Sequence, residues 1–181
     1  MLAYVGIGSN RDGPAVQVER ALAELARLGP LRGSCLYRSE PWGRGDQPWF
    51  VNAVAEMACE RPARWLFERL QAIERAAGRT REGDRWGPRV LDLDLLLFGD
   101  QRIDQPDLVV PHPRFARRRF VLAPLAELAP ELEDPVSRQA VRRLLSELDD
   151  PGRVEKMRRP GGVSGSAPRQ RRPARPEVAT R

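Results

Sequence analysis

The stretch from Leu91 to Phe98 limits the fold of this 181-residue chain more than any other part of the sequence. Side chains alternate between the two faces of an extended strand, so Asp92 and Asp94 share one face. Leu96 and Phe98 continue that face as apolar residues, which an open, solvated face would not do. The opposite face carries only leucines: Leu91, Leu93, Leu95 and Leu97. We therefore expect a buried strand that presents two carboxylates one pleat apart.

The two carboxylates favour a metal site. Like charges on one strand face repel each other, and a cation between them removes that cost. Hard oxygen ligands suit Mg²⁺, which proteins often hold jointly with substrate phosphates. The alternative is that Asp92 and Asp94 belong to a solvated strand face that needs no ligand.

An arginine-rich loop precedes this strand. Glycines and a proline interrupt it, which excludes a continuous helix. Guanidinium groups grip phosphate oxygens through planar pairs of donors and offset the negative charge of phosphoryl transfer. Alone, such a loop is more often a soluble connection, but its position beside Asp92 and Asp94 favours phosphate chemistry. Its arginines are Arg79, Arg81, Arg85 and Arg89.

Hydrophobic periodicity predicts the order strand, helix, strand, strand, helix, strand over the first hundred residues. This order indicates an α+β fold with a ferredoxin-like βαββαβ core, in which a four-stranded antiparallel sheet packs both helices on one face. Extra C-terminal helices are expected at residues 121–128 and 137–148. The core elements are expected at residues 2–7, 14–28, 31–40, 49–59, 62–77 and 91–98.

The strand expected at residues 49–59 has two different faces. Phe50 and Asn52 share one face, where a ring can stack on a flat heterocycle and an amide can hydrogen-bond its edge. Spacing alone supports equally well that Phe50 is ordinary core and Asn52 a polar strand end. The other face is expected in the core: Val51, Ala53, Ala55 and Met57.

Charge divides the chain into two parts. The formal net charge is +6, yet residues 151–181 carry +7 and residues 1–150 carry −1. The second part is rich in Pro, Gly, Ser, Ala and Arg, so it lacks the apolar surface that would offset the entropy of ordering. We expect one folded domain at residues 1–150 and a basic, disordered tail at residues 151–181.

Cysteine content and the N-terminal sequence also indicate the cellular compartment. Cys35 and Cys59 are too few for a disulfide framework or a cysteine-based zinc site. The N-terminal apolar run is too short for a signal peptide or a membrane span. These features favour a reduced, cytoplasmic protein without a membrane partner.

Two nucleotide-binding motifs are excluded, while one histidine stays a candidate. The single lysine, Lys156, rules out a Walker A loop, and the Gly6 and Gly8 pair lacks the third glycine of a dinucleotide fingerprint. A lone histidine is usually structural. His112, however, stands between two prolines in an extended segment that presents its ring for phosphate or ribose contact.

Further motifs occur in order along the chain. They are residues 4–10 (YVGIGSN), 46–52 (DQPWFVN), 85–94 (RWGPRVLDLD), and 110–113 (VPHP) with 118–122 (RRFVL). Together they closely resemble the 6-hydroxymethyl-7,8-dihydropterin pyrophosphokinase family of folate biosynthesis. The resemblance covers about residues 2–148 and leaves the tail outside it.

The resemblance implies that ATP transfers its β,γ-pyrophosphoryl group to the pterin hydroxymethyl oxygen and releases AMP. Asp92 and Asp94 would hold two Mg²⁺ ions with ATP, and Arg79 and Arg89 would be the catalytic residues that stabilise the transferring group. The pterin would contact Ser39, Glu40, Trp42, Phe50, Asn52 and Phe120. ATP would contact Gln71, Glu74, Arg81, Trp86, His112 and Arg118.

The implied partners are ATP and the pterin, bound by a monomer with no specific nucleic-acid partner. Two rivals remain. A metal-dependent nuclease or phosphohydrolase also uses paired carboxylates and arginines, and a nucleic-acid module would rely on the basic tail. Arg119 adds a charge beside Phe120, and the sequence leaves its effect on pterin affinity open.

Overall fold

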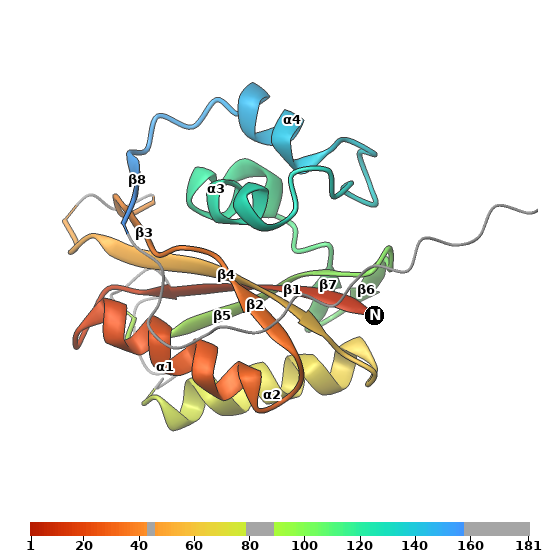
Figure 1. The fold of residues 1–181 in the computed structure, drawn as a ribbon, viewed down its shortest axis with the longest axis horizontal. Coiled ribbons are helices and arrows are strands. Elements are labelled where there is room, and N and C mark those ends of the chain that lie inside the picture. Colours follow the sequence, from red (N-terminus) through yellow and green to blue (C-terminus); the bar gives the residue numbers. More distant parts are fainter. Residues whose placement is uncertain (43–45, 79–88, 158–181) are drawn as a thin grey trace, which may run out of the picture.

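The computed structural model describes residues 1–42, 46–78 and 89–157. They form three layers, with the sheet between α1 and α2 on one face and α3 and α4 on the other (Figure 1). This arrangement allows both faces of the sheet to bury apolar side chains. The helices are α1 (Pro14–Ala26), α2 (Ala63–Ala76), α3 (Arg119–Leu128) and α4 (Val141–Glu147), with a 3-10 turn η1 (Phe115–Arg117).

The central sheet has six strands, in the order β5, β1, β4, β3, β8, with β2 also paired to β4. Every pairing in it is antiparallel. Because β1 lies between β4 and β5, this is the strand order of a split βαβ core, and the predicted α+β fold is confirmed. The strands are β1 (Leu2–Ser9), β2 (Leu31–Gly33), β3 (Tyr37–Ser39), β4 (Phe50–Ala58), β5 (Asp92–Phe98) and β8 (Val154–Lys156).

The layer between the sheet and the helices α1 and α2 is apolar. Pro14 begins α1, a position where its missing N–H costs nothing. The buried faces of both helices pack on alternate residues of the sheet. The β4 residues predicted to lie in the core all join this cluster: Val51, Ala53, Ala55 and Met57.

Strand β5 departs from simple alternation at Leu96. Leu95 pairs with Val5 of β1, and Leu97 pairs with the preceding β1 residue, so Leu96 is an extra residue in a β-bulge. Leu96 and Leu97 therefore both pack under α3, whereas Phe98 packs toward α1 and α2. The predicted faces of Leu97 and Phe98 are wrong, because the sequence pattern does not reveal the extra residue.

The strand expected at residues 31–40 is two short strands, β2 and β3, and both pair with β4. Ser34 lies in the break between them. Its N–H donates to the Val54 carbonyl at 2.9 Å, and its Oγ accepts from the Val54 N–H at 3.0 Å. This hydroxyl takes a place in the pairing with β4, so the ladder is interrupted there without leaving the Val54 N–H unpaired.

Two further boundaries differ from the expected ones. The last helix begins at Val141 rather than Ser137, because the Asp134 carboxylate accepts hydrogen bonds from the N–H of Val136 and of Ser137 and holds a turn. The segment after Asp100 also contains an unpredicted hairpin. It pairs β6 (Ile103–Gln105) with β7 (Leu108–Val110).

The C-terminal part of the described chain is ordered where disorder was expected. Strand β8 pairs with β3 at the edge of the sheet, and the Met157 N–H donates to the Leu36 carbonyl at 2.8 Å. The expected boundary at residue 150 therefore cuts off an edge strand. Residues 158–181, the rest of the predicted tail, lie outside the described residues.

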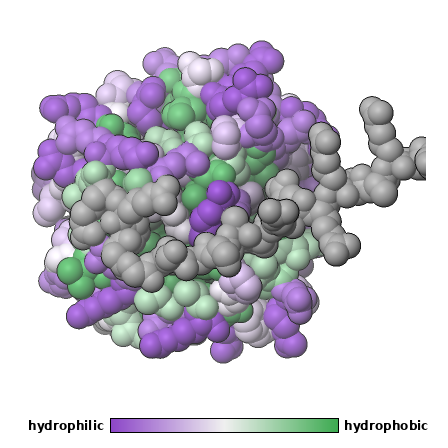
Figure 2. Space-filling view, in the orientation of Figure 1, coloured by the Kyte–Doolittle hydropathy of each residue, from purple (hydrophilic) through white to green (hydrophobic). Residues whose placement is uncertain are grey.

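The surface seen in the space-filling view is mainly hydrophilic, with hydrophobic residues in small separate areas (Figure 2). In the described part of the chain, no helix is long and apolar enough to cross a membrane.

Candidate active site

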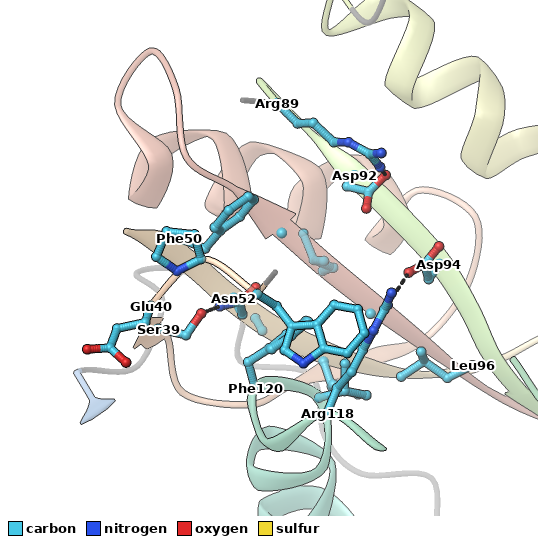
Figure 3. A pocket seen from close by; sticks show the side chains of 18 of the residues that line it. Ser39, Glu40, Phe50, Asn52, Arg89, Asp92, Asp94, Leu96, Arg118 and Phe120 are labelled. Atoms are coloured by element: carbon cyan, nitrogen blue, oxygen red, sulfur yellow. Dashed lines mark hydrogen bonds and ion pairs between the residues drawn. The ribbon is translucent and has the colours of Figure 1, made fainter. Parts of the chain in front are cut away.

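A cavity opens on the α3 side of the sheet, between β4, β1 and β5 and the first turn of α3 (Figure 3). Together with the solvent-filled space at its open mouth, it has a volume of about 860 Å³. Residues far apart in the sequence meet there. Ten of the predicted site residues line it: Ser39, Glu40, Trp42, Phe50, Asn52, Arg89, Asp92, Asp94, Arg118 and Phe120.

Two glycines of β1 form the floor of the cavity. Gly8 lies between Asn52 of β4 and Asp92 of β5, and Gly6 lies opposite Asp94. A Cβ atom at Gly8 would lie 3.2 Å from the Asn52 Oδ1. Glycine at these positions leaves space between the amide and the carboxylates. The sequence pattern placed Gly6 and Gly8 in a rejected dinucleotide motif and in the family motif at residues 4–10, but did not indicate this role.

The Asp92 and Asp94 carboxylates form one wall of the cavity, next to two arginines and a histidine. Arg89 Nη1 lies 2.6 Å from Asp92 Oδ1, and Asp94 Oδ2 lies 3.6 Å from Arg118 Nη1 and 3.7 Å from His112 Nε2. Burial raises the pKa of Asp94, and the charge of Asp92 raises it further, whereas the three cationic or basic groups oppose this shift. The pair is therefore under repulsion that an added cation would relieve.

This donor set fits a divalent cation. In the described ranges there is no group of three or more His, Cys, Asp or Glu side chains that could hold an ion. Asp92 and Asp94 supply hard oxygen ligands on one strand face, so the remaining positions of an ion would be open to ligand oxygens or water. A metal held jointly by the protein and a phosphate compound suits such a pair.

His112 faces the carboxylates with a defined ring nitrogen. Its Nδ1 accepts a hydrogen bond from the Arg114 N–H at 3.2 Å, so the neutral ring carries its proton on Nε2, which faces Asp94. Burial lowers the pKa of His112, although Asp94 opposes this shift. The neutral ring is thus a hydrogen-bond donor at the edge of the carboxylate wall.

Arg118 connects the carboxylate wall to the aromatic side of the cavity. Its guanidinium carbon lies 5.3 Å from the centre of the Trp42 ring and 5.6 Å from that of Phe120. Its Nε is buried and has no hydrogen-bond partner among the described residues. Because a buried donor without a partner costs free energy, this group is suited to a ligand acceptor.

The opposite wall combines aromatic rings with an amide. Asn52 is 4% exposed, and its Nδ2 donates to Ser39 Oγ at 2.9 Å, which fixes the orientation of the amide. Phe50 and Phe120 are half-buried at the cavity surface. The Glu40 carboxylate points away from the cavity toward the C-terminal strand (Figure 3) and accepts from the Arg153 N–H at 3.1 Å.

Asn10 is a structural residue of the site whose role the sequence pattern did not indicate. Its Oδ1 accepts from the Arg89 N–H at 2.7 Å, and its own N–H donates to the Arg89 carbonyl at 3.0 Å. Its Nδ2 donates to Gln47 Oε1 and to the Pro48 carbonyl, both at 3.3 Å. Asn10 therefore fixes Arg89 and the segment before Phe50 to the end of β1. Its position shortly after Gly6 and Gly8 is the sequence feature that could have indicated this role.

Two predicted site residues lie on α2, which packs on the other face of the sheet. Glu74 is 5% exposed, and its Oε1 accepts from the Leu93 N–H at 2.7 Å, between the two aspartates. It therefore fixes the backbone that carries them. Gln71 is half-buried on the same helix. Arg79, Arg81 and Trp86 fall outside the described residues.

Comparison with known proteins shows the family of this chain. Residues 4–130 match the family described as 7,8-dihydro-6-hydroxymethylpterin-pyrophosphokinase (HPPK). A 2-amino-4-hydroxy-6-hydroxymethyldihydropteridine pyrophosphokinase of Pseudomonas aeruginosa is 49% identical over 138 residues, which cover 75% of this chain and 85% of that protein. The enzyme of the same name from Methylorubrum extorquens is 43% identical over 159 residues, covering 84% and 98%.

A solved structure with the same fold is Plasmodium falciparum HPPK-DHPS, with a TM-score of 0.64 and 16% sequence identity. The match covers 80% of this chain and only 45% of that longer chain. This structural likeness supports the α+β fold. The family itself is shown by the family match and by the sequence identity to the two bacterial enzymes. The chain therefore belongs to the 7,8-dihydro-6-hydroxymethylpterin-pyrophosphokinase family.

Proposed function

We propose that this protein transfers pyrophosphate from ATP to 6-hydroxymethyl-7,8-dihydropterin, giving AMP and the pterin diphosphate in folate biosynthesis. The observation that carries the proposal is that one cavity joins a carboxylate and guanidinium wall to an aromatic and amide wall. The first suits a triphosphate with its metal, and the second suits a flat heterocycle. Family membership supports the same reaction.

For the pterin, the residues on the β4 side of the cavity supply the contacts. Phe50 and Phe120 would stack on the two faces of the ring, and Asn52 would read its hydrogen-bonding edge. The fixed orientation of the Asn52 amide supports this role, because a preset donor and acceptor pair loses little entropy on binding. Ser39, Glu40 and Trp42 would contribute backbone groups at the rim.

For the metal, Asp92 and Asp94 would hold two Mg²⁺ ions together with ATP. Bound magnesium would offset the charge of the triphosphate. The repulsion that raises the pKa of Asp94 supports a cation at this position, since a cation favours both ionised carboxylates. Glu74 would act through the Leu93 N–H, by keeping the strand between the carboxylates in place.

For the transferring group, Arg89 and Arg79 would stabilise the negative charge that develops. Arg118, His112, Gln71, Arg81 and Trp86 would frame ATP. The pterin hydroxymethyl oxygen attacks the β-phosphorus, the bond between that phosphorus and the α,β-bridging oxygen breaks, and AMP leaves. Such catalysis depends on positioning and charge neutralisation and needs no protein nucleophile.

We also propose that the enzyme is cytoplasmic, acts as a monomer and has no specific nucleic-acid partner.

The test is to assay the purified full chain with ATP, Mg²⁺ and 6-hydroxymethyl-7,8-dihydropterin. The expected result is one AMP per pterin diphosphate formed, and no AMP when the pterin is left out. Release of phosphate or AMP at the same rate without the pterin would support the phosphohydrolase alternative and overturn the proposal. Asp94→Asn serves as the matched inactive control, because it preserves side-chain size while removing the charge.

A further inference from the structure

Residues 149–157, here called the C-terminal strap, cross from the first turn of α3 to β3. They lie beyond residue 130, where the family match ends, and beyond the expected end of the fold. β8 forms the last part of the strap, at the edge of the sheet beside β3 (Figure 1). The strap thus touches two elements that each carry a wall of the proposed pterin site.

The first contact of the strap is with the start of α3. The residue before this helix, Arg118, makes no side-chain capping hydrogen bond. Instead Asp150 Oδ2 accepts from the Arg119 N–H at 2.8 Å, while Oδ1 accepts from the Gly152 N–H at 3.0 Å. Both carboxylate oxygens are therefore engaged, and a distant residue satisfies one of the open N–H groups of the helix.

The Arg119 side chain strengthens this contact. Its Nε donates to the Asp150 carbonyl at 3.2 Å and its Nη2 to the Leu148 carbonyl at 3.1 Å. Its charge is therefore tied to the strap. Arg118 and Phe120, on either side of Arg119, both line the cavity. Holding the Arg119 backbone fixes where Phe120 enters the site, whereas the Arg118 guanidinium is also held by Asp94, at 3.6 Å.

The second contact of the strap is with the opposite wall. The Glu40 N–H donates to the Arg153 carbonyl at 3.1 Å, and Ser39 pairs with Val154. Ser39 in turn accepts the hydrogen bond that orients Asn52. β3 has only three residues, so its pairing with β8 is a large part of what holds it. The strap therefore links the start of α3, beside Phe120, to the wall that carries Asn52.

We propose that Asp150 is a positioning residue for the pterin site, which acts by capping α3 and fixing Phe120 opposite Asn52. The identity of the ligand rests on the proposed function. The strap does not carry the metal site: Asp92 and Asp94 lie on β5, at the far edge of the sheet from β8. Loss of the Asp150 contact is therefore expected to affect the pterin much more than ATP.

The experiment compares three variants of the full chain: Asp150→Ala, Asp150→Asn and, as matched control, Glu147→Gln. Glu147 lies just before the strap in an exposed pair with Arg143 and has no place in the site. Calorimetry measures binding of the pterin, and separately of a non-hydrolysable ATP analogue with Mg²⁺. Asp150→Ala is expected to weaken pterin binding about five-fold, as loss of a helix cap implies, and to change ATP-analogue binding less than about two-fold.

Asp150→Asn keeps one acceptor oxygen and is expected to recover part of the affinity, while Glu147→Gln matches the wild type. Unchanged pterin affinity in Asp150→Ala would overturn the inference. So would equal weakening of both ligands, since that is the result of a general loss of stability.

A second readout does not depend on turnover or on the ligand. Amide hydrogen exchange at residues 119–122 of the free protein is expected to be faster in Asp150→Ala than in Glu147→Gln, and equal rates would contradict the capping role. Failure of the wild type to bind the pterin would count against the proposed function, whereas the exchange result would still decide the role of Asp150.

Discussion

The two faces of the central sheet come from the same strands but are used in different ways. Toward α1 and α2, alternate residues of β1, β4 and β5 form one continuous apolar layer. Toward α3 and α4, a second apolar cluster covers only part of the sheet, and the rest is the cavity with its glycines, amide and carboxylates. One face is closed over its length, and the other is left partly open.

This difference separates stability from function along a single strand. In β5, Leu93 and Leu95 contribute burial, while Asp92 and Asp94 on the other face place charge in a partly buried site. Burial of apolar area stabilises the fold, whereas a buried charge without its ligand works against it. Substitutions on the two faces should therefore have opposite signatures.

The largest effect is expected for Asp94→Asn on the open face. Turnover should fall about a thousand-fold or more, since a carboxylate that would hold the Mg²⁺ of the triphosphate is lost. Because burial raises the pKa of Asp94, its ionised form opposes folding at neutral pH. The melting temperature of the free protein should therefore rise by about 1 to 3 °C. Assays of AMP formation and thermal unfolding measure both, and near-normal turnover would contradict the site.

The reverse result is expected for Leu95→Ala on the closed face. Leu95 is 4% exposed in the apolar layer, so its truncation should lower the free energy of unfolding by about 3 kcal/mol. Turnover per folded molecule should stay within about three-fold of wild type. Denaturant unfolding and AMP assays provide the measurements. The control is Val109→Ala, whose parent side chain is 38% exposed and whose loss should cost less than about 1 kcal/mol.

A smaller effect, specific to one ligand, is expected for Gly8→Ala at the floor of the cavity. The new methyl group would lie 3.2 Å from Asn52 Oδ1, so the amide must shift. Pterin binding should weaken about ten-fold, equivalent to about 1.4 kcal/mol. Binding of an ATP analogue is the internal control and should hardly change. Equal losses for both ligands would show that the glycine serves the whole sheet rather than the pterin side.

The smallest effect on stability is expected at Glu127, where α3, which covers part of the open face, contacts the edge of the sheet. Glu127 of α3 accepts hydrogen bonds from Tyr37 Oη at 2.8 Å and from the Cys35 N–H at 3.2 Å, and it pairs with Lys156 of β8. Burial raises the pKa of Glu127, but these hydrogen bonds and the lysine outweigh it and leave the pKa lowered. A lowered pKa in the folded state means stability that is present at neutral pH and lost as the pH falls through that pKa.

Glu127→Gln should therefore cost about 1 kcal/mol near pH 7, and the difference from wild type should shrink toward zero near pH 3. Thermal unfolding at the two pH values checks this expectation. A difference of the same size at both would mean that packing, not charge, links α3 to β3 and β8.

The sequence predicted the elements that follow a regular period. Alternation placed Asp92 and Asp94 opposite the leucines, and it separated Phe50 and Asn52 from the core face of β4. The bulge at Leu96 and the interruption at Ser34 were missed, because each adds or removes pairing partners without changing the local pattern. Strand β8 was missed because three residues have no periodicity of their own and are ordered only by pairing with β3.

The site was predicted to a similar extent. The carboxylate pair, the arginine loop, His112 and the alternative that Phe50 and Asn52 contact a flat heterocycle came from the residues themselves. The other pterin and ATP contacts came from the family resemblance. Asn10 and Asp150 were missed because their contacts join segments that are distant in sequence, 79 residues apart for Asn10 and Arg89. No local pattern reports such a pairing.

The bulge in β5 also separates two requirements that would otherwise be linked. Before it, pairing with Gly8 and Gly6 fixes which way Asp92 and Asp94 point. Beyond the bulge, Leu97 and Phe98 pair with β1 in a register shifted by one residue. A deletion of Leu96 would remove the bulge and leave Leu97, Phe98 and both carboxylates on their present faces. A deletion of Leu93, between the aspartates, would instead turn one of the two carboxylates toward the apolar layer. The strand can thus tolerate length variation at one end while its chemistry is preserved at the other.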